Sequence, residues 1–192
     1  MPNLDAVVKA YDIRGTVPDQ LDETLAHAFG VAFAKFSDAK TIVVGHDMRP
    51  SGLSLIEAFQ NGLTEQGVDV INLGLASTDM LYFASGKLNA PGAMFTASHN
   101  PAQYNGIKCC LSGARSIGID NGLREMKVIA QDVLDGKGPA AAKTQGEVTK
   151  KNMLAEFVDH VVSFIDVDSI SKLRVVADTA NGMGGLVAPA VF

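Results

Sequence analysis

Apolar residues recur at helical spacing near the start of the chain. Behind Asp19, a candidate N-cap, the segment 21–36 places them three or four positions apart: Leu21, Leu25, Phe29, Ala32, Phe33 and Phe36. Residues at this spacing share one face of a helix. The pattern therefore predicts an amphipathic helix over 21–36.

Short apolar runs alternate with further helical patterns up to residue 95. The runs occupy 41–44, 68–73 and 92–95, and the helical patterns between them occupy 55–63 and 80–87. Strands that alternate with helices of this length are joined by right-handed crossovers and form a parallel sheet covered on both faces. We therefore predict an α/β fold with a mixed, mostly parallel sheet sandwiched by helices.

The alternation of strands and helices ends after residue 95. A polar loop over 96–106 precedes a strand at 107–111 and a helix at 121–133. The segment 136–146 then lacks periodicity and collects Gly, Pro, Ala and Lys, a composition typical of a linker.

A domain boundary is expected at this linker. We predict a first domain over 1–138, followed over 139–192 by a linker and the incomplete start of a second α/β domain. That start is expected to hold a helix at 151–165, a strand at 173–177 and the beginning of a terminal helix. The remainder of the second domain is expected beyond Phe192.

Composition and charge exclude several classes of protein. Of 192 residues, 47% are apolar and 19% charged, so the chain can bury a core. The formal net charge of −5 disfavours nucleic acid and anionic membranes as partners. The adjacent Cys109 and Cys110 would point to opposite faces of a strand, which argues against a disulfide framework or a zinc site. No long apolar run or signal-peptide layout is found, and a cytoplasmic location is expected.

The loop after the strand at 92–95 collects chemically useful groups. It offers a hydroxyl, an imidazole, an amide, a rigid backbone position and a cation, on Ser98, His99, Asn100, Pro101 and Lys108. Open α/β sheets place ligands at the carboxyl ends of their strands. From the residues alone, a solvated turn is an equally good interpretation. Serine hydrolysis is disfavoured, because Ser98 and His99 are adjacent and no G-x-S-x-G elbow occurs.

Four segments carry a resemblance to a known family. TASHNPAQYNGIK at 96–108 resembles the phosphoserine loop of the α-D-phosphohexomutase superfamily, and KAYDIRG at 9–15 resembles a motif of its phosphomannomutase/phosphoglucomutase branch. VVGHDMRPSG at 43–52 is similar to the family's G-x-D-x-R-x-S segment, and VVADTANGMGG at 175–185 to the opening of its second domain. The resemblance spans nearly the whole chain.

The resemblance implies an activity and a set of site residues. The activity is intramolecular phosphotransfer that interconverts hexose 1-phosphate and hexose 6-phosphate through a sugar bisphosphate, with Ser98 as the phosphate carrier. Positioning and charge neutralisation are what phosphoryl transfer demands of a protein. Lys108 resembles the general acid/base, and Arg14 is expected to bind the phosphoserine. Substrate-binding or loop-orienting roles are implied for Tyr11, His99 and Asn100.

Other polar residues near these motifs have open interpretations. Asp47 and Arg49 could orient the loop or simply hold their own turn together, and we leave both out of the catalytic set. His46 stands where the family segment has Arg. His27 and His160 occur within helical patterns and are expected to be packing or surface residues.

The resemblance also implies a metal and an activator. Mg²⁺ would be held by the Ser98 phosphate and by carboxylates of a D-x-D-x-D loop, which is expected beyond Phe192. Asp166 and Asp168 are expected to form a helix-end turn rather than a metal site. The implied activator is glucose 1,6-bisphosphate or mannose 1,6-bisphosphate. The 192-residue chain alone is expected to lack turnover.

Two other functions remain open at this point. One is a noncatalytic module that binds sugar phosphates reversibly, and the other is a domain that serves only as a surface for a partner. The partners expected for a mutase are small hexose phosphates. The sequence does not rank mannose against glucose, nor does it give an oligomeric state.

Overall fold

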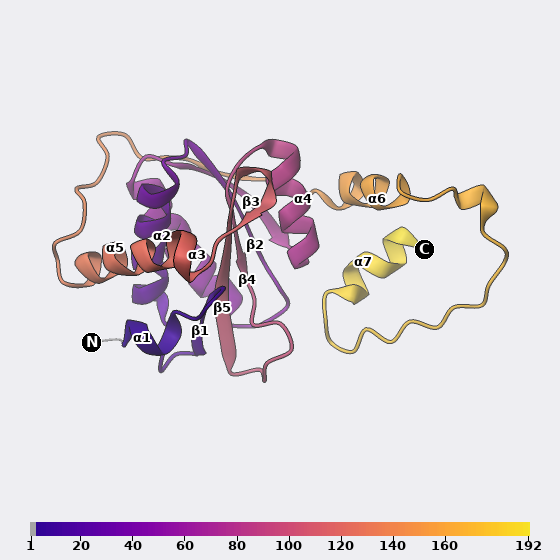
Figure 1. Cartoon of the computed structure of the whole chain (residues 1–192), viewed down its shortest axis with the longest axis horizontal. Coiled ribbons are helices and arrows are strands. Elements are labelled where there is room, and N and C mark those ends of the chain that lie inside the picture. Colours follow the sequence, from indigo (N-terminus) through magenta and orange to yellow (C-terminus); the bar gives the residue numbers. More distant parts are fainter. Residues whose placement is uncertain (1–2) are drawn as a thin grey trace.

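A single seven-stranded sheet organises the protein, whose computed structural model describes residues 3–192 (Figure 1). Its main path runs β1-β5-β4-β2-β3-β7, and β6 pairs with β5 at the side. The strands β4, β2, β3 and β7 are parallel, whereas β5 is antiparallel to both β1 and β4. The strands span Ile13–Thr16 (β1), Thr41–His46 (β2), Asp69–Leu75 (β3), Gly92–Phe95 (β4), Tyr104–Leu111 (β5), Arg115–Ser116 (β6) and Val148–Lys150 (β7).

Helices cover both faces of this sheet. On one face α2, α3 and α5 bury a large apolar cluster, and on the other α4 and α6 bury a smaller one (Figure 1). The helices span Leu4–Val7 (α1), Glu23–Ser37 (α2), Gly52–Glu65 (α3), Thr78–Leu88 (α4), Arg124–Leu134 (α5), Leu154–Val162 (α6) and Gly184–Val191 (α7). The predicted fold class, a mixed and mostly parallel sheet sandwiched by helices, is confirmed.

The first predicted helix is present with shifted ends. α2 begins after Asp22, not Asp19, because the Asp22 carboxylate accepts a hydrogen bond of 2.8 Å from the backbone N–H of Leu25. It packs tightly on α3, since a Cβ added at Gly30 would lie 2.2 Å from the carbonyl oxygen of Phe59. This close contact fixes the helical layer on that face of the sheet.

The segment after residue 138 differs from the sequence interpretation. Val148–Lys150 forms β7 and extends the sheet beside β3, and Met153 and Phe157 are buried against α4. Residues 139–192 therefore contribute to the packing of the first sheet, while the boundary after residue 138 stays a prediction.

The strand predicted at 173–177 is wrong. These residues hold no strand, and Val176 is 91% exposed. A β-branched run forms a strand only when another strand offers its hydrogen-bonding edge. Figure 1 shows this part of the chain as an extended loop before α7, with no strand beside it. Within residues 3–192, no helix is long and apolar enough to cross a membrane.

Candidate active site

The serine loop, residues 96–103, connects the end of β4 to the start of β5. Its ends are anchored by two backbone hydrogen bonds, from Thr96 to the Gly106 carbonyl at 3.0 Å and from Val17 to the Gln103 carbonyl at 2.8 Å. Ser98 is exposed, and its φ of 54° lies in the left-handed region. A serine in this conformation is held there by its surroundings, because the left-handed region is unfavourable for residues with a Cβ.

A buried arginine holds the loop backbone. The guanidinium of Arg49, only 6% exposed, donates four hydrogen bonds of 2.7 to 2.8 Å to the carbonyl oxygens of Ser98, Asn100, Pro101 and Tyr104. A planar guanidinium can serve several acceptors in fixed directions. Of the two interpretations left open for Arg49, the structure supports the first: it orients the loop.

Asp47 and Thr96 complete this arrangement. The Asp47 carboxylate accepts hydrogen bonds from the Arg49 backbone N–H at 3.0 Å and from the Thr96 hydroxyl at 2.7 Å. The Thr96 hydroxyl oxygen in turn accepts a hydrogen bond of 3.0 Å from the Ser98 N–H. The Asp47 carboxylate also lies 3.3 Å from Nε of Arg49, within ion-pair distance but outside hydrogen-bond geometry.

A second arginine reaches the loop from β1. Nη1 of Arg14 donates a hydrogen bond of 2.9 Å to the side-chain oxygen of Asn100, and Nη2 pairs with the carboxylate of Asp12, itself 8% exposed. Nε of Arg14 is buried without a hydrogen-bond partner among residues 3–192. The structure therefore brings Arg14 and Asn100 together at the loop, while binding of a phosphoserine by Arg14 stays a prediction.

Lys108 and Arg14 project from the same face of the sheet. Arg14 lies opposite Gly106 in the β1–β5 ladder, and Lys108 lies opposite Met94 in the β4–β5 ladder. Directly opposed residues share a face, as do alternate residues along a strand. Because Met94 belongs to the cluster under α4, both cations lie on the α4 side.

Ser98 and His99 contact each other, whereas Tyr11 makes no hydrogen bond to the loop in the described structure. Ser98 Oγ and His99 Nδ1 are 3.2 Å apart, so the side chains of these two adjacent residues are in contact. Within residues 3–192 no hydrogen bond joins His99 to a carboxylate, and the third group of a hydrolase triad is therefore missing from the described part. Tyr11 is 75% exposed and has no hydrogen bond to the loop in the described structure, so its substrate-binding role stays a prediction.

Among the described residues, Ser98 is the expected oxygen ligand for Mg²⁺ at this site. Ser98 could contribute its hydroxyl or phosphate oxygen, but no group of three or more His, Cys, Asp or Glu side chains that could hold a metal occurs within residues 3–192. Mg²⁺ requires several hard oxygen ligands. Asp166 and Asp168 lie at an exposed 3₁₀ turn over Val167–Ser169.

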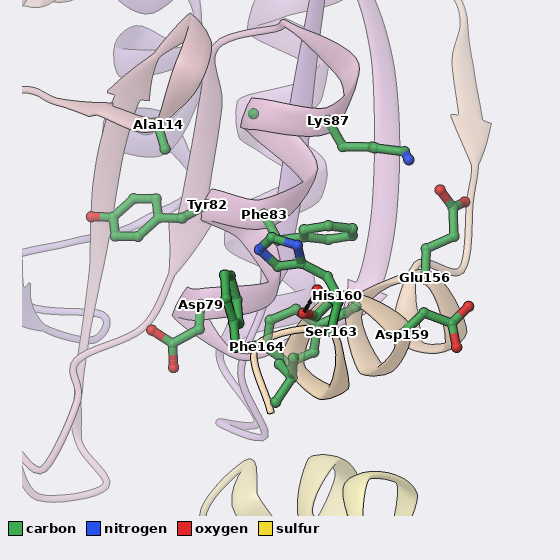
Figure 2. A pocket seen from close by; sticks show the side chains of 13 residues that line it. Asp79, Tyr82, Phe83, Lys87, Ala114, Glu156, Asp159, His160, Ser163 and Phe164 are labelled. Atoms are coloured by element: carbon green, nitrogen blue, oxygen red, sulfur yellow. Dashed lines mark hydrogen bonds between the residues drawn. The ribbon is translucent and has the colours of Figure 1, made fainter. Parts of the chain in front are cut away.

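A hollow of about 950 Å³ lies between α4 and α6, and Figure 2 shows the side chains that line it. Its wall includes Phe83, His160 and Phe164, with His160 stacked on Phe83 at a ring separation of 4.9 Å. None of the predicted site residues lines it. His160 is a packing residue here, and Nε2 of His27 lies within hydrogen-bond distance of the Glu65 carboxylate, at 2.8 Å.

The fold and the loop together define an α/β/α domain that presents a serine at the carboxyl end of a strand. The family model described as phosphoglucomutase/phosphomannomutase, alpha/beta/alpha domain I, matches residues 5–129. The chain belongs to the phosphoglucomutase/phosphomannomutase family.

Relatives from several bacteria agree with this assignment. The chain is 38% identical over 184 residues to phosphomannomutase of Escherichia coli strain K12, covering 95% of this chain and 40% of that protein. It is 40% identical over 181 residues to phosphohexose mutases of Xanthomonas campestris pv. campestris strain B100, covering 93% and 39%. The structure of a phosphoglucomutase/phosphomannomutase family protein from Burkholderia thailandensis superposes with a TM-score of 0.72 at 29% identity, covering 85% of this chain and 36% of that one. The chain thus spans about two fifths of the length of these relatives.

Sequence reasoning missed two contributors to the site. Asp12 lies inside the KAYDIRG segment, and Thr96 opens the serine segment, yet neither was assigned a role. Their membership of the motifs was the available signal. The contact between Thr96 and Asp47 forms only when β2 and β4 pair, whereas Asp12 lies two residues from its partner Arg14.

Proposed function

We propose that this chain is part of a sugar-phosphate mutase in which Ser98 carries the phosphate between positions of a hexose. The single observation that carries the proposal is the exposed Ser98 in a left-handed conformation, with its loop fixed by Arg49. The names of the relatives, phosphomannomutase and phosphohexose mutases, support it. Rigid presentation of one hydroxyl suits a reaction whose main requirement is positioning.

The proposed reaction has two transfers. In the first, the bond between phosphorus and Ser98 Oγ breaks and a bond forms to a free hydroxyl oxygen of the bound hexose phosphate, while Lys108 takes the proton of that hydroxyl and passes it to the released Ser98 Oγ. In the second, the phosphate originally on the sugar moves to Ser98 Oγ, while Lys108 takes the proton of the Ser98 hydroxyl and passes it to the sugar oxygen that is released. Between the transfers the sugar is a 1,6-bisphosphate.

Arg14 is suited to bind phosphate oxygens beside Ser98. It already reaches the loop through Asn100, and its buried Nε has a donor without a partner among residues 3–192. A guanidinium keeps its charge at any working pH and can bind two oxygens at once. His99 and Asn100 would orient the sugar or the loop, and Tyr11 is available at the surface for substrate.

We further propose Mg²⁺ as the metal and glucose 1,6-bisphosphate or mannose 1,6-bisphosphate as activator. The Ser98 oxygens would provide one ligand to the metal, and when bound it would neutralise charge on the phosphoryl group. The other ligands would come from outside residues 3–192, and we propose that the 192-residue chain alone lacks turnover. A cytoplasmic location is part of the same proposal.

Intact mass and phosphopeptide mapping test the carrier role. The chain is incubated with glucose 1,6-bisphosphate and Mg²⁺, and one phosphate is expected on Ser98 and none on the Ser98→Ala variant. The Thr64→Ala variant is the matched control, because it removes an exposed hydroxyl outside the site and should be phosphorylated normally. Reversible binding of the bisphosphate that survives Ser98→Ala and leaves no covalent phosphate would instead identify a noncatalytic binding module.

A further inference from the structure

Both backbone polar groups of Ser98 are held by one connected set of side chains. Its N–H donates to the Thr96 hydroxyl oxygen at 3.0 Å, and its carbonyl accepts from Nη2 of Arg49 at 2.8 Å. Asp47 joins the two, because its carboxylate accepts from the Thr96 hydroxyl at 2.7 Å and from the Arg49 backbone N–H at 3.0 Å. The peptide groups on both sides of the left-handed residue are thereby fixed.

The direction of each hydrogen bond matters. A hydroxyl has one proton, and that of Thr96 is donated to Asp47. Its lone pairs are therefore free to accept from the N–H of Ser98. An ionised Asp47 can only accept, so it holds the Thr96 hydroxyl in the orientation that Ser98 requires.

Burial makes these bonds durable. Thr96, Asp47 and Arg49 are 7%, 4% and 6% exposed, so water does not compete for their polar groups, whereas the Ser98 side chain remains at the surface. A conformation that is unfavourable for serine persists only where its surroundings determine it several times over. Buried side chains thus hold the backbone of a residue whose hydroxyl is exposed.

We propose that Thr96, Asp47 and Arg49 form a positioning unit that keeps Ser98 in its left-handed conformation and thereby aims Oγ for phosphoryl transfer. The inference rests on the proposed function for the transfer itself. None of the three side chains is the acceptor or donor of phosphate. They act through the backbone of Ser98, and Thr96 is the member whose hydroxyl can be removed at nearly constant volume.

The test compares Thr96→Val with Thr96→Ser. Valine keeps the branched shape and loses the hydroxyl, whereas serine keeps the hydroxyl. Solution NMR of the chain reads the Ser98 backbone through the intraresidue cross-peak between its amide and α protons, which is strongest at positive φ. Mass spectrometry follows the rate of Ser98 phosphorylation by glucose 1,6-bisphosphate and Mg²⁺.

We expect Thr96→Val to weaken the Ser98 cross-peak and to slow phosphorylation at least about tenfold, and Thr96→Ser to preserve both. Arg49→Lys, which keeps the charge but cannot reach four carbonyls, should act like Thr96→Val and serves as the second variant if valine prevents folding. Thermal unfolding confirms that each variant is folded.

Two outcomes overturn the positioning unit: an unchanged Ser98 cross-peak in folded Thr96→Val and Arg49→Lys, or a changed cross-peak with an unchanged phosphorylation rate. Failure of the unsubstituted chain to take up phosphate is a different result. It contradicts loading of Ser98 by the isolated chain, whose other metal ligands are proposed to lie outside residues 3–192, and the NMR comparison then decides by itself whether the unit sets the conformation of Ser98.

Discussion

Nη1 of Arg14 donates a hydrogen bond of 2.9 Å to Oδ1 of Asn100, a residue 86 positions later in the chain. This bond links strand β1 to the serine loop. Nη2 of the same guanidinium pairs with the carboxylate of Asp12. The two motifs recognised separately in the sequence, KAYDIRG and the serine segment, thus meet in one hydrogen-bonded group.

Loss of the Arg14 charge should destabilise the fold through Asp12. In Arg14→Met the buried Asp12 carboxylate keeps its charge and loses its partner, at an expected cost of about 2 kcal/mol in the free energy of unfolding. Adding Asp12→Asn removes the uncompensated charge, so the double variant should regain about 1 kcal/mol. Urea unfolding measures both, and a double variant no more stable than Arg14→Met would contradict this role for Asp12.

The strained conformation of Ser98 should be visible in stability. With φ at 54°, Ser98→Gly relieves the clash of its Cβ and is expected to raise the free energy of unfolding by about 1 kcal/mol. Ser98→Ala is the matched control, because it removes the hydroxyl and keeps the Cβ. Thermal unfolding of both variants is the measurement, and an equal response would show that the Ser98 backbone stores no strain.

The sequence predicted the elements whose apolar patterns are uninterrupted. The helix at 21–36 appears as α2 with its start shifted by two residues and its end by one, the strand at 41–44 as β2 extended to His46, and the strand at 92–95 as β4 with the same ends. Their apolar periodicity depends only on which side of the element is buried. The local apolar pattern was therefore sufficient to predict these three elements.

The elements that sequence reasoning missed depend on a neighbour. Ile13–Thr16 becomes β1 because β5 offers a hydrogen-bonding edge, and Val148–Lys150 becomes β7 because β3 does. Neither segment has enough alternating apolar residues to predict a strand alone. Conversely, 173–177 reads as a strand but has no partner strand in the described structure.

In the candidate site, too, some residues could be identified from their motifs and others only from their contacts in the folded structure. The serine segment identified Ser98 and Asn100, KAYDIRG identified Arg14, and the structure joins Arg14 to the loop through Asn100. A third motif, at 43–52, contained Arg49, but its role could not be decided, because an arginine that binds four carbonyls is recognised only from the folded loop.

Gly106 should tolerate no larger residue. A Cβ there would lie 2.4 Å from the carbonyl oxygen of Ile13 in β1 and 3.0 Å from that of Thr96 at the start of the serine loop, both backbone atoms. Gly106→Ala is expected to cost about 1–3 kcal/mol in the free energy of unfolding. Gly86→Ala is the control, because nothing lies within 4 Å of a Cβ there, and alanine in α4 should stabilise by about 0.5–1 kcal/mol. Urea unfolding would contradict the crowding at Gly106 if both variants were stabilised.

The two buried cysteines should make the fold sensitive to alkaline pH. Burial raises the pKa of the Cys109 thiol above its ordinary 9.0, and the nearby Cys110 adds to the rise. Burial likewise raises the pKa of Cys110, while a hydrogen bond from Ser85 partly opposes the shift. Neither thiol is in a disulfide.

The sign of the effect follows from proton binding. Above pH 9.0, the ordinary thiol pKa, the unfolded chain releases thiol protons that the folded chain keeps, so ionisation favours the unfolded state. The stabilisation is therefore complete below that pH and declines as the pH rises, by at most about 1.4 kcal/mol per pH unit for each thiol. Urea unfolding at about pH 8 and about pH 9.5 should show the decline. Cys109→Val, which keeps an apolar side chain in β5, should reduce it, and an equal decline in both proteins would mean that Cys109 does not cause it.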